Sequence, residues 1–471
     1  MRILLAAHAL PPATRGGTEL YTVRLAEKFA ARGHAVTVAA PRGADATVEG
    51  ATVVELPDAA PRPEDGVGLS RAAGVEQPEI DDAVSTLFDE GSSTADIVHL
   101  QHFKGLSSGI PSLCADRGVP CIATLHDFWT LCHREQLRKP DGTPCSGPTS
   151  IAKCAECYAD AVARFAAESS DGTDAERIRP GLESGFADAV ARRTRGLRRA
   201  LGDCDRLVSP SRYLRDVFVD FGFDSARIVH RRNGIRTDEF RGSTFDADTP
   251  LQIGYAGRIA ESKGVHLLVE ALDHISADVD LHVHGSFSPD EEPYHASLRD
   301  AARRIEGSAE RDRIRFHGSY PDAPAVFDAL DVFVLPSIWV ENSPLVIQEA
   351  FAAGVPVVTG DRGGMAELVT HGDDGLTVPV GDVDALAEAL ERLAVDPELV
   401  RRLRAGVEPP TELDDHATEL LALYREQLRA DGSDESGGRP EGRNESGGRQ
   451  SAGADAAEES ENPYGTNRDD P

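Results

Sequence analysis

Short apolar segments that alternate with amphipathic ones constrain the fold of this chain more than any other feature. In the first such unit, a glycine loop and an amphipathic segment (19–34) join the apolar runs 2–8 and 35–40, and Gly33 stands where a helix is expected to end. Apolar strands alternating with helices are typical of a parallel sheet covered on both faces. Further strands of this first half are expected at "DIVHLQH" (96–102), "PCIATLH" (120–126) and "CDRLVSPS" (204–211).

The same pattern restarts near residue 250. The expected strands are "LQIGYAG" (251–257), "VDLHVHG" (279–285), "RIRFHG" (313–318), "DVFVLPS" (331–337) and "VPVVTG" (355–360). The sequence therefore predicts two Rossmann-like, doubly wound α/β domains, in which ligands bind beyond the carboxyl ends of the strands. We expect domains over 1–235 and 236–410, an amphipathic helix over 411–429, and a disordered acidic Gly/Ser-rich tail over 430–471.

The charge balance limits the partners of the chain. It carries 80 acidic and 49 basic residues, a net charge of −31, and its few lysines include Lys263. An acid-rich surface suits a halophile with a high-salt cytoplasm, where salt screens self-repulsion. It disfavours a broad nucleic-acid-binding face, which needs a basic footprint. No apolar run reaches the length of a membrane span, and the N-terminus is expected to be a buried strand and not a signal peptide, so the predicted location is cytoplasmic.

The stretch "WVENSPLVIQEAFAAGVPVV" (339–358) holds two glutamates, Glu341 and Glu349. Ser343 and Pro344 are typical of an N-cap and a first helical position, so a helix is expected over 344–353 with its amino end open to an anion. A glycosidase-type pair needs carboxyl groups about 5 Å apart in a retaining enzyme, whereas a helix rises about 1.5 Å per residue. Two glutamates at different depths along one elongated ligand fit better, with two solvated charges as the alternative.

A second charged motif follows the first strand of the second half. In "GYAGRIAESKG" (254–264), Arg258 and Lys263 lie directly after the strand, among glycines that allow close backbone approach. Arginine and lysine that converge near a helix amino end are suited to binding a diphosphate.

In this combination the sequence resembles the retaining nucleotide-sugar glycosyltransferases of glycosyltransferase family 4, which have the two-domain GT-B fold. The resemblance spans most of residues 1–405. Its matching pieces are "RGGTE" (15–19), "TLHDFW" (124–129), "SPSRYLRDVF" (209–218), "NGI" (233–235), "GRIAESKG" (257–264), "RFHGSY" (315–320), "DVFVLPS" (331–337), "ENSPLVIQEA" (341–350) and "RGGMAEL" (362–368).

The resemblance implies a role for each matching residue. The second domain would bind the nucleotide sugar: Arg258 and Lys263 its diphosphate, Glu341 the transferred sugar and Glu349 the ribose. Backbone amides of the helix start would meet the phosphates, at Ser343, Pro344, Leu345 and Val346. Pro344 stands where the family often has glycine, which puts its own phosphate contact in doubt.

From the acceptor-side first domain, Gly16 and Gly17 would close over the diphosphate, and His126 would lie beside the sugar. The implied chemistry is front-face substitution with retention, and it requires no metal or other cofactor.

Histidines and cysteines leave alternatives open. His8, His99 and His102 end expected strands, where they either contact ligand or serve structure. Cys132, Cys145, Cys154 and Cys157 follow the His126 motif, and a Cys-x2-Cys pair with two further cysteines can hold a structural zinc, with free thiols as the alternative. Some related transferases carry a similar cysteine-bearing loop.

We therefore expect a hexosyltransferase that moves a sugar from a nucleotide diphosphate to a carbohydrate, lipid-linked or glycan acceptor, with peripheral membrane contact if the acceptor requires it. The setting would be the assembly of surface polysaccharide, glycolipid or protein-linked glycan. A nucleotide-sugar epimerase or phosphorylase on the same fold and a non-catalytic nucleotide-sugar-binding subunit are the rival readings. The charged residues Arg258, Lys263, Glu341 and Glu349 argue against an inert subunit, which has no need of all four.

Overall fold

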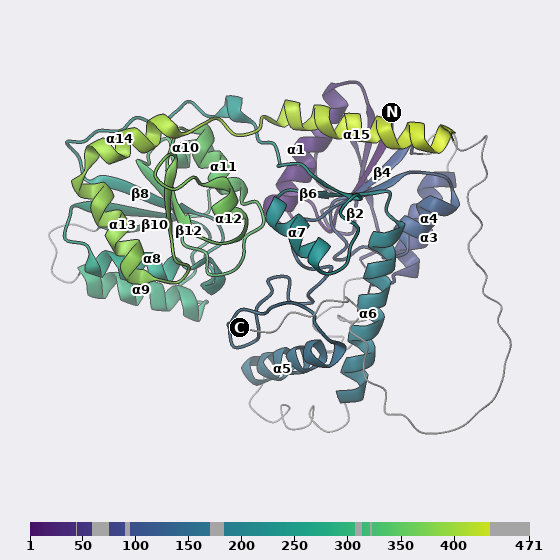
Figure 1. Cartoon of the computed structure of the whole chain (residues 1–471), viewed down its shortest axis with the longest axis horizontal. Helices are drawn as coiled ribbons and strands as arrows, with labels where there is room; N and C mark the ends of the chain where they lie inside the picture. The colour runs from purple at the N-terminus through teal and green to yellow at the C-terminus, as the bar shows by residue number, and fades with distance from the viewer. Residues whose placement is uncertain are drawn as a thin grey trace.

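The computed structural model shows two parallel sheets side by side, each between layers of helices (Figure 1). It describes residues 1–43, 45–58, 75–89, 95–169, 183–306, 313–320 and 323–433. The part of the expected tail beyond residue 433 lies outside the described residues. Among the described residues, no helix combines the length and the apolar character that crossing a membrane requires.

The first sheet has the strand order β3-β2-β1-β4-β5-β6-β7, with all pairs parallel. Successive side chains of β1 point to opposite faces: Ile3 and Leu5 join one core cluster and Leu4 joins the other. The strands are β1 (Arg2–Ala6), β2 (Ala35–Ala40), β3 (Thr52–Glu55), β4 (Ile97–Leu100), β5 (Cys121–Thr124), β6 (Arg206–Ser209) and β7 (Ile228–His230).

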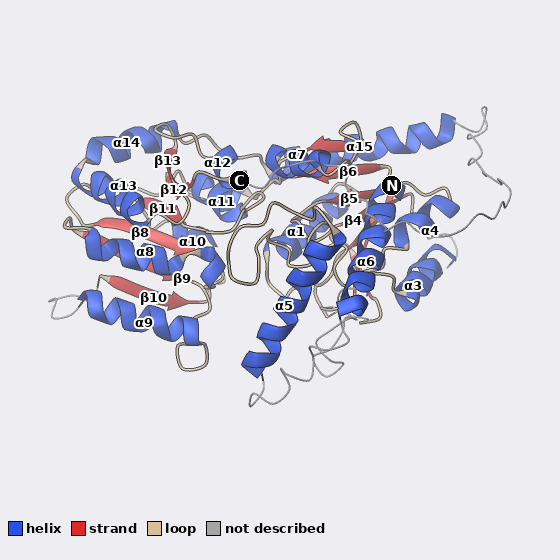
Figure 2. Cartoon of the chain, turned by 60° about the horizontal axis from the view of Figure 1, so that its bottom comes forward, coloured by secondary structure: helices blue, strands red, loops and turns tan. Residues whose placement is uncertain are grey.

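Two helical layers cover this sheet. Residues of α1 and α15 pack on one face, and residues of α3, α4, α6 and α7 pack on the other, while α5 contacts α6 (Figure 2). The helices of this half are α1 (Gly17–Ala31), α3 (Pro78–Asp89), α4 (Ile110–Asp116), α5 (Ile151–Ser169), α6 (Glu183–Asp203) and α7 (Arg212–Asp220).

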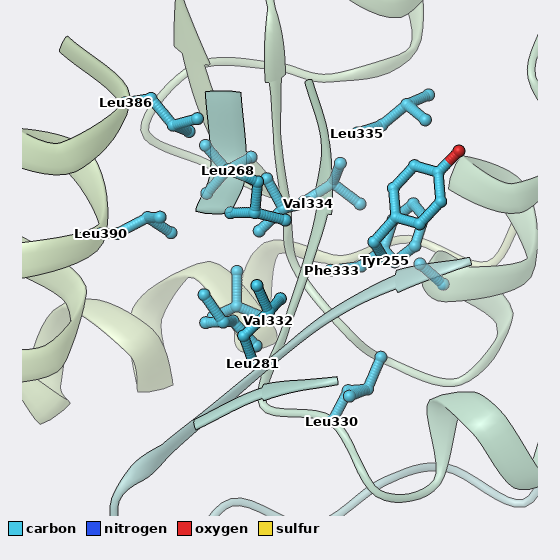
Figure 3. Close-up of a cluster of buried hydrophobic side chains, with 14 of the residues drawn as sticks. Tyr255, Leu268, Leu281, Leu330, Val332, Phe333, Val334, Leu335, Leu386 and Leu390 are labelled. Atoms are coloured by element: carbon cyan, nitrogen blue, oxygen red, sulfur yellow. The ribbon is translucent and has the colours of Figure 1, made fainter. Parts of the chain in front are cut away.

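The second sheet has the order β10-β9-β8-β11-β12-β13, again all parallel. Its core gathers buried side chains of neighbouring strands and helices, among them Leu268, Leu281 and Phe333 (Figure 3). The strands are β8 (Leu251–Ala256), β9 (Val279–His284), β10 (Ile314–Gly318), β11 (Val332–Leu335), β12 (Val357–Gly360) and β13 (Gly375–Val378).

Helix α8 contacts both α9 and α13, and α11 contacts both α10 and α12. The helical segments are η3 (Thr237–Glu239), η4 (Glu261–Lys263), α8 (Val265–Ala271), η5 (Leu272–His274), α9 (Pro293–Glu306), α10 (Ala323–Phe327), α11 (Leu345–Ala352), α12 (Gly363–Leu368), α13 (Val383–Val395) and α14 (Pro397–Gly406). The two doubly wound Rossmann-like domains expected from the sequence are therefore confirmed.

Every strand expected from an apolar run is present, and the strands that the sequence did not reveal are β3, β7 and β13. β3 has no buried residue, and β7 is only three residues long, so neither gives a continuous apolar run.

The last helix, α15 (Leu413–Ser433), returns to the first domain. It lies along α1 (Figure 1), and Leu420 and Tyr424 join the same core cluster as Ile3. At the crossing, Ile235 N donates to the carbonyl of Thr411 at 3.1 Å and Leu413 N donates to that of Ile235 at 2.8 Å. The helix expected over 411–429 thus begins two residues later and extends beyond 429.

Candidate functional site

Two loops that leave neighbouring strands form the base of the site. One follows β8 and carries Arg258 and Lys263, and the other follows β11. Ile338 N donates to the carbonyl of Ser262 at 3.0 Å, which ties the loops together. Gly264 has φ of +72°, and a Cβ there would lie 2.0 Å from the carbonyl oxygen of Pro336, so this close approach requires glycine.

Glu341 is the centre of a charged cluster. Its Oε1 accepts hydrogen bonds from Lys263 Nζ at 2.6 Å, Ser337 Oγ at 2.6 Å and Trp339 Nε1 at 2.7 Å. The Glu341 residue is only 5% exposed, so these donors replace the water that a carboxylate loses on burial. The structure thus brings Lys263 and Glu341 into contact, as expected if both bind one ligand.

Sequence reasoning missed Ser337 and Trp339 as members of this cluster. They stand four and two residues before Glu341, within the same stretch, and only the turn of the loop directs their polar atoms to its carboxylate.

Arg258 lies on the same loop as Lys263 with an exposed side chain. The hydroxyl of Tyr255, which points away from the core in Figure 3, donates to the carbonyl of Arg258 at 2.6 Å and so fixes the start of that loop.

The start of α11 corrects one prediction. The helix spans Leu345–Ala352, and Pro344, in extended conformation, is its N-cap. Ser343 does not cap it, since its hydroxyl is buried without a hydrogen-bond partner in the described structure. Proline has no backbone N–H, so Pro344 cannot give the amide contact expected of it, and the available donors are those of Ser343, Leu345 and Val346.

Glu349 lies inside α11 and is 6% exposed. Burial raises the pKa of Glu349, and Arg24, whose Nη1 lies 3.5 Å from Oε1, offsets part of that effect. Arg24 comes from α1 of the first domain, so this ion pair joins the two halves. Nothing in the sequence around Arg24 indicates it.

The glycine loop faces this helix. A Cβ on Gly17 would lie 3.6 Å from Leu345 Cδ1, which places the loop opposite the start of α11. Gly16 N donates to Glu19 Oε2 at 3.1 Å, and Thr14 Oγ1 donates to Glu19 Oε1 at 2.7 Å, so a buried carboxylate holds the loop in shape. Gly16 and Gly17 therefore lie where a group bound at α11 would meet them.

His126 approaches the same region from the first domain. Its Nε2 lies 3.2 Å from Gln101 Oε1, and burial lowers its pKa to about 3, so the ring is neutral near pH 7.

Asn342, the neighbour of Glu341, donates from Nδ2 to the carbonyls of Leu125 at 3.1 Å and His126 at 3.0 Å. Ser211 Oγ donates to Asn342 Oδ1 at 2.5 Å. This buried amide joins the His126 loop to the Glu341 loop.

The other strand-end histidines differ from one another. His99 is fully buried and uses both ring nitrogens internally, with Tyr424 Oη at 2.5 Å and Thr124 Oγ1 at 2.7 Å. His8 Nε2 lies 3.2 Å from Glu19 Oε1, which connects it to the glycine loop. His102 bonds to Asp127 and to the backbone N–H of Lys104. His99 is structural, while His8 adjoins the site through Glu19.

The cysteine loop gives no support to the predicted zinc site. Among the described residues, no group of three or more histidine, cysteine, aspartate or glutamate side chains is arranged to hold a metal ion. Cys145 Sγ accepts a hydrogen bond from Gly147 N at 3.4 Å, and burial raises the pKa of Cys154 to about 12 and that of Cys157 to about 11. Metal analysis of the protein beside a Cys154→Ser/Cys157→Ser variant tests the prediction.

The same loop does reach the site. Arg138 Nη1 donates to the carbonyl of Ile338 at 2.6 Å, next to Trp339. The loop after the His126 motif is thus braced against the loop that carries the charged cluster.

A protein-family model matches each half of the chain. Residues 16–234 match the glycosyl transferase 4-like domain, and residues 250–396 match the glycosyl transferases group 1. The amylovoran biosynthesis glycosyltransferase AmsK of Erwinia amylovora is 31% identical over 239 residues, 47% of this chain and 56% of the relative. The GDP-mannose-dependent alpha-(1-6)-phosphatidylinositol monomannoside mannosyltransferase of Mycolicibacterium smegmatis is 32% identical over 238 residues, 46% of this chain and 60% of the relative. The chain thus spans about half the length of the curated relatives it matches.

Solved structures share the fold. Anabaena Alr3699/HepE in complex with UDP superposes with a TM-score of 0.62 at 18% identity, over 90% of this chain and 100% of that one. Sucrose-phosphate synthase of Thermosynechococcus elongatus gives a TM-score of 0.64 at 19% identity, over 91% of this chain and 99% of that one. On this GT-B fold, the first half of the chain matches the glycosyl transferase 4-like domain and the second half matches the group 1 glycosyl transferases.

Proposed function

We propose that the protein is a retaining glycosyltransferase that moves a hexose or related sugar from a nucleotide-diphosphate sugar to an acceptor hydroxyl. The observation that carries the proposal is the contact between Lys263 and Glu341, with the start of α11 and the glycine loop facing each other beside it. One elongated ligand carrying a diphosphate between a sugar and a ribose matches this order of groups. The names of the curated relatives, which include polysaccharide and glycolipid transferases, support the same reaction class.

In this proposal the second domain binds the donor. Lys263, Arg258 and the N–H groups of Leu345 and Val346 stabilise the negative charge that develops on the departing diphosphate. Positive charge from side chains can neutralise the leaving group, so we propose that bond cleavage requires no metal.

The two glutamates bind neutral parts of the donor. Glu341 accepts a hydrogen bond from a hydroxyl of the transferred sugar, and Glu349 accepts from the ribose. Neither acts as a nucleophile. The bond between the anomeric carbon and the phosphate oxygen breaks, the acceptor oxygen bonds to that carbon on the same face, and the hydroxyl proton passes to the departing phosphate, so the anomeric configuration is retained.

The first domain supplies the acceptor side. His126 is neutral, and with Gln101 Oε1 as its acceptor Nε2 carries the proton, so the ring orients a sugar hydroxyl without adding charge. Gly16 and Gly17 close over the diphosphate because they add no side chain there. We place the reaction in the cytoplasm, in surface polysaccharide, glycolipid or glycan assembly, with peripheral membrane contact when the acceptor is lipid-linked.

The test is a screen of UDP-, GDP-, ADP- and dTDP-sugars for donor hydrolysis and thermal stabilisation, in high salt because the net charge is −31. Lys263→Ala and Glu349→Ala should each abolish transfer while the protein stays folded. Lys28→Ala, a surface lysine paired with Asp414, and Glu388→Ala, an exposed glutamate of α13, are matched controls. Wild-type turnover by either site variant would overturn the assignment.

A further inference from the structure

Trp339 contacts both members of the central ion pair. Its Nε1–H donates to Glu341 Oε1 at 2.7 Å, and Lys263 Nζ lies 5.0 Å from the centroid of its ring. The two charged groups are themselves 2.6 Å apart. One indole therefore offers a hydrogen-bond donor to the anion and an aromatic face to the cation.

Glu341 and Lys263 both keep hydrogen-bonding positions that the described structure does not use. All the hydrogen bonds that the described structure gives the Glu341 side chain end on Oε1, so Oε2 remains as an acceptor. An ammonium group has three protons, and Lys263 directs only one of them at Glu341. Each partner keeps hydrogen-bonding capacity for a further polar group.

The indole has a fixed base. The preceding residue, Ile338, donates its N–H to Ser262 and accepts from Arg138 through its carbonyl, at 3.0 Å and 2.6 Å. Trp339 thus stands on backbone held from the Lys263 loop on one side and from the first domain on the other. The ring cannot turn away without losing its bond to Glu341.

We propose that Trp339 is a positioning residue that holds Lys263 and Glu341 in one orientation for a sugar nucleotide. The inference rests on the proposed function, because it assigns the ligand of this pair. Without the N–H, Glu341 loses one of the donors that orient its free oxygen, and without the ring, the Lys263 ammonium loses the surface that directs it toward a diphosphate.

Two substitutions separate these contributions. Trp339→Phe keeps an aromatic face and removes the N–H, and the lost charge-assisted hydrogen bond should lower kcat about tenfold to a hundredfold. Trp339→Leu removes both and should lower kcat further and raise the donor KM. The melting temperature of both variants should stay close to that of the wild type. Trp129→Phe, the matched change at the other tryptophan, should leave kcat and KM unchanged.

The two tryptophans also allow a readout that does not depend on turnover. In the Trp129→Phe protein Trp339 is the only tryptophan, so the tryptophan fluorescence comes from Trp339 alone and should respond when a ligand binds at Lys263. Titration with UDP, GDP and ADP, with calorimetry in parallel, should give a saturable change in emission for each nucleotide that binds. The Trp339→Phe protein should show no matching change.

The outcomes distinguish the inference from the function on which it rests. Calorimetric binding without an emission change, together with wild-type kcat and KM for Trp339→Phe, overturns the role of Trp339 and leaves the proposed function standing. If no nucleotide binds and no sugar nucleotide is turned over, the proposed function fails, and the inference fails with it.

Discussion

The two halves of the molecule place polar residues at the same structural position and use them differently. In the second half, residues that follow neighbouring strands meet each other, as Lys263 and Glu341 do at 2.6 Å. In the first half, His99 also belongs to the end of a strand, yet both its ring nitrogens bond within the fold, to Tyr424 and Thr124. A position at the carboxyl end of a strand therefore makes a polar residue a candidate for ligand binding. The hydrogen-bond partners of its side chain decide whether it can bind a ligand or instead stabilises the fold.

The sharpest way to break this comparison is to remove one residue from each half. Glu341→Ala should lower kcat/KM by about 10²- to 10³-fold, the usual cost of a lost transition-state contact. His99→Ala should leave Tyr424 and Thr124 without a buried partner and cost about 3 kcal/mol of unfolding free energy. Urea unfolding and transferase assays on both variants measure the difference.

The comparison fails if the two variants behave alike. A folded His99→Ala protein with the stability of the wild type and the activity of Glu341→Ala would assign His99 a role in the transfer reaction. Assays well below the melting temperature keep lost folding apart from lost activity.

Sequence patterns predicted the positions of the candidate-site loops that lie within one domain. The apolar runs before Arg258 and before Glu341 are continuous and almost entirely buried, so the position of each loop followed from its strand. Ser343 shows where this fails: its type suits an N-cap, but Pro344 takes that place, and the Ser343 hydroxyl has no hydrogen-bond partner among the described residues. Residue type alone does not fix a cap.

Contacts between the domains could not be predicted in the same way. Arg24 lies on α1 with no motif around it, and it reaches Glu349 only because α1 and α11 face each other. Asn342 is adjacent to a predicted site residue, yet its partners Leu125 and His126 are more than two hundred residues away. Such pairs depend on how the two domains dock, which no local periodicity encodes.

The Arg24–Glu349 pair gives a smaller effect with a defined pH dependence. Burial already raises the pKa of Glu349 above 4.5, and Arg24→Met removes the charge that offsets this, so the pKa should rise further. A protonated Glu349 accepts ribose hydroxyls less well, so the donor KM should begin to increase at a higher pH in the variant as pH falls. Kinetics from about pH 5 to 8 would follow this shift.

The pH dependence of the unfolding free energy tests the Arg24–Glu349 pair independently of activity. A carboxyl group with a raised pKa binds its proton more tightly in the folded state, so stability falls as pH rises from 4.5 through the folded-state pKa. In Arg24→Met that window should extend upward. Arg24→Lys should restore part of the wild-type profile, and Arg42→Met, which breaks the surface pair with Asp58, should leave it unchanged. An identical pH profile for Arg24→Met would exclude coupling between the two domains at this point.

The smallest expected effect concerns a contact between the halves that lies outside the charged cluster. Glu367 of α12 accepts the backbone N–H groups of Arg212 at 3.0 Å and Tyr213 at 3.1 Å, in the first turn of α7. It thus caps a helix of the other domain with a negative charge, an interaction of about 1 kcal/mol or less at a partly exposed site. Glu367→Gln keeps an acceptor oxygen and loses the charge, so the melting temperature should fall slightly while kcat is preserved. A large loss of kcat at an unchanged melting temperature would instead mean that this contact sets how the domains close over the donor, and the division between chemical and structural contacts would have to be redrawn there.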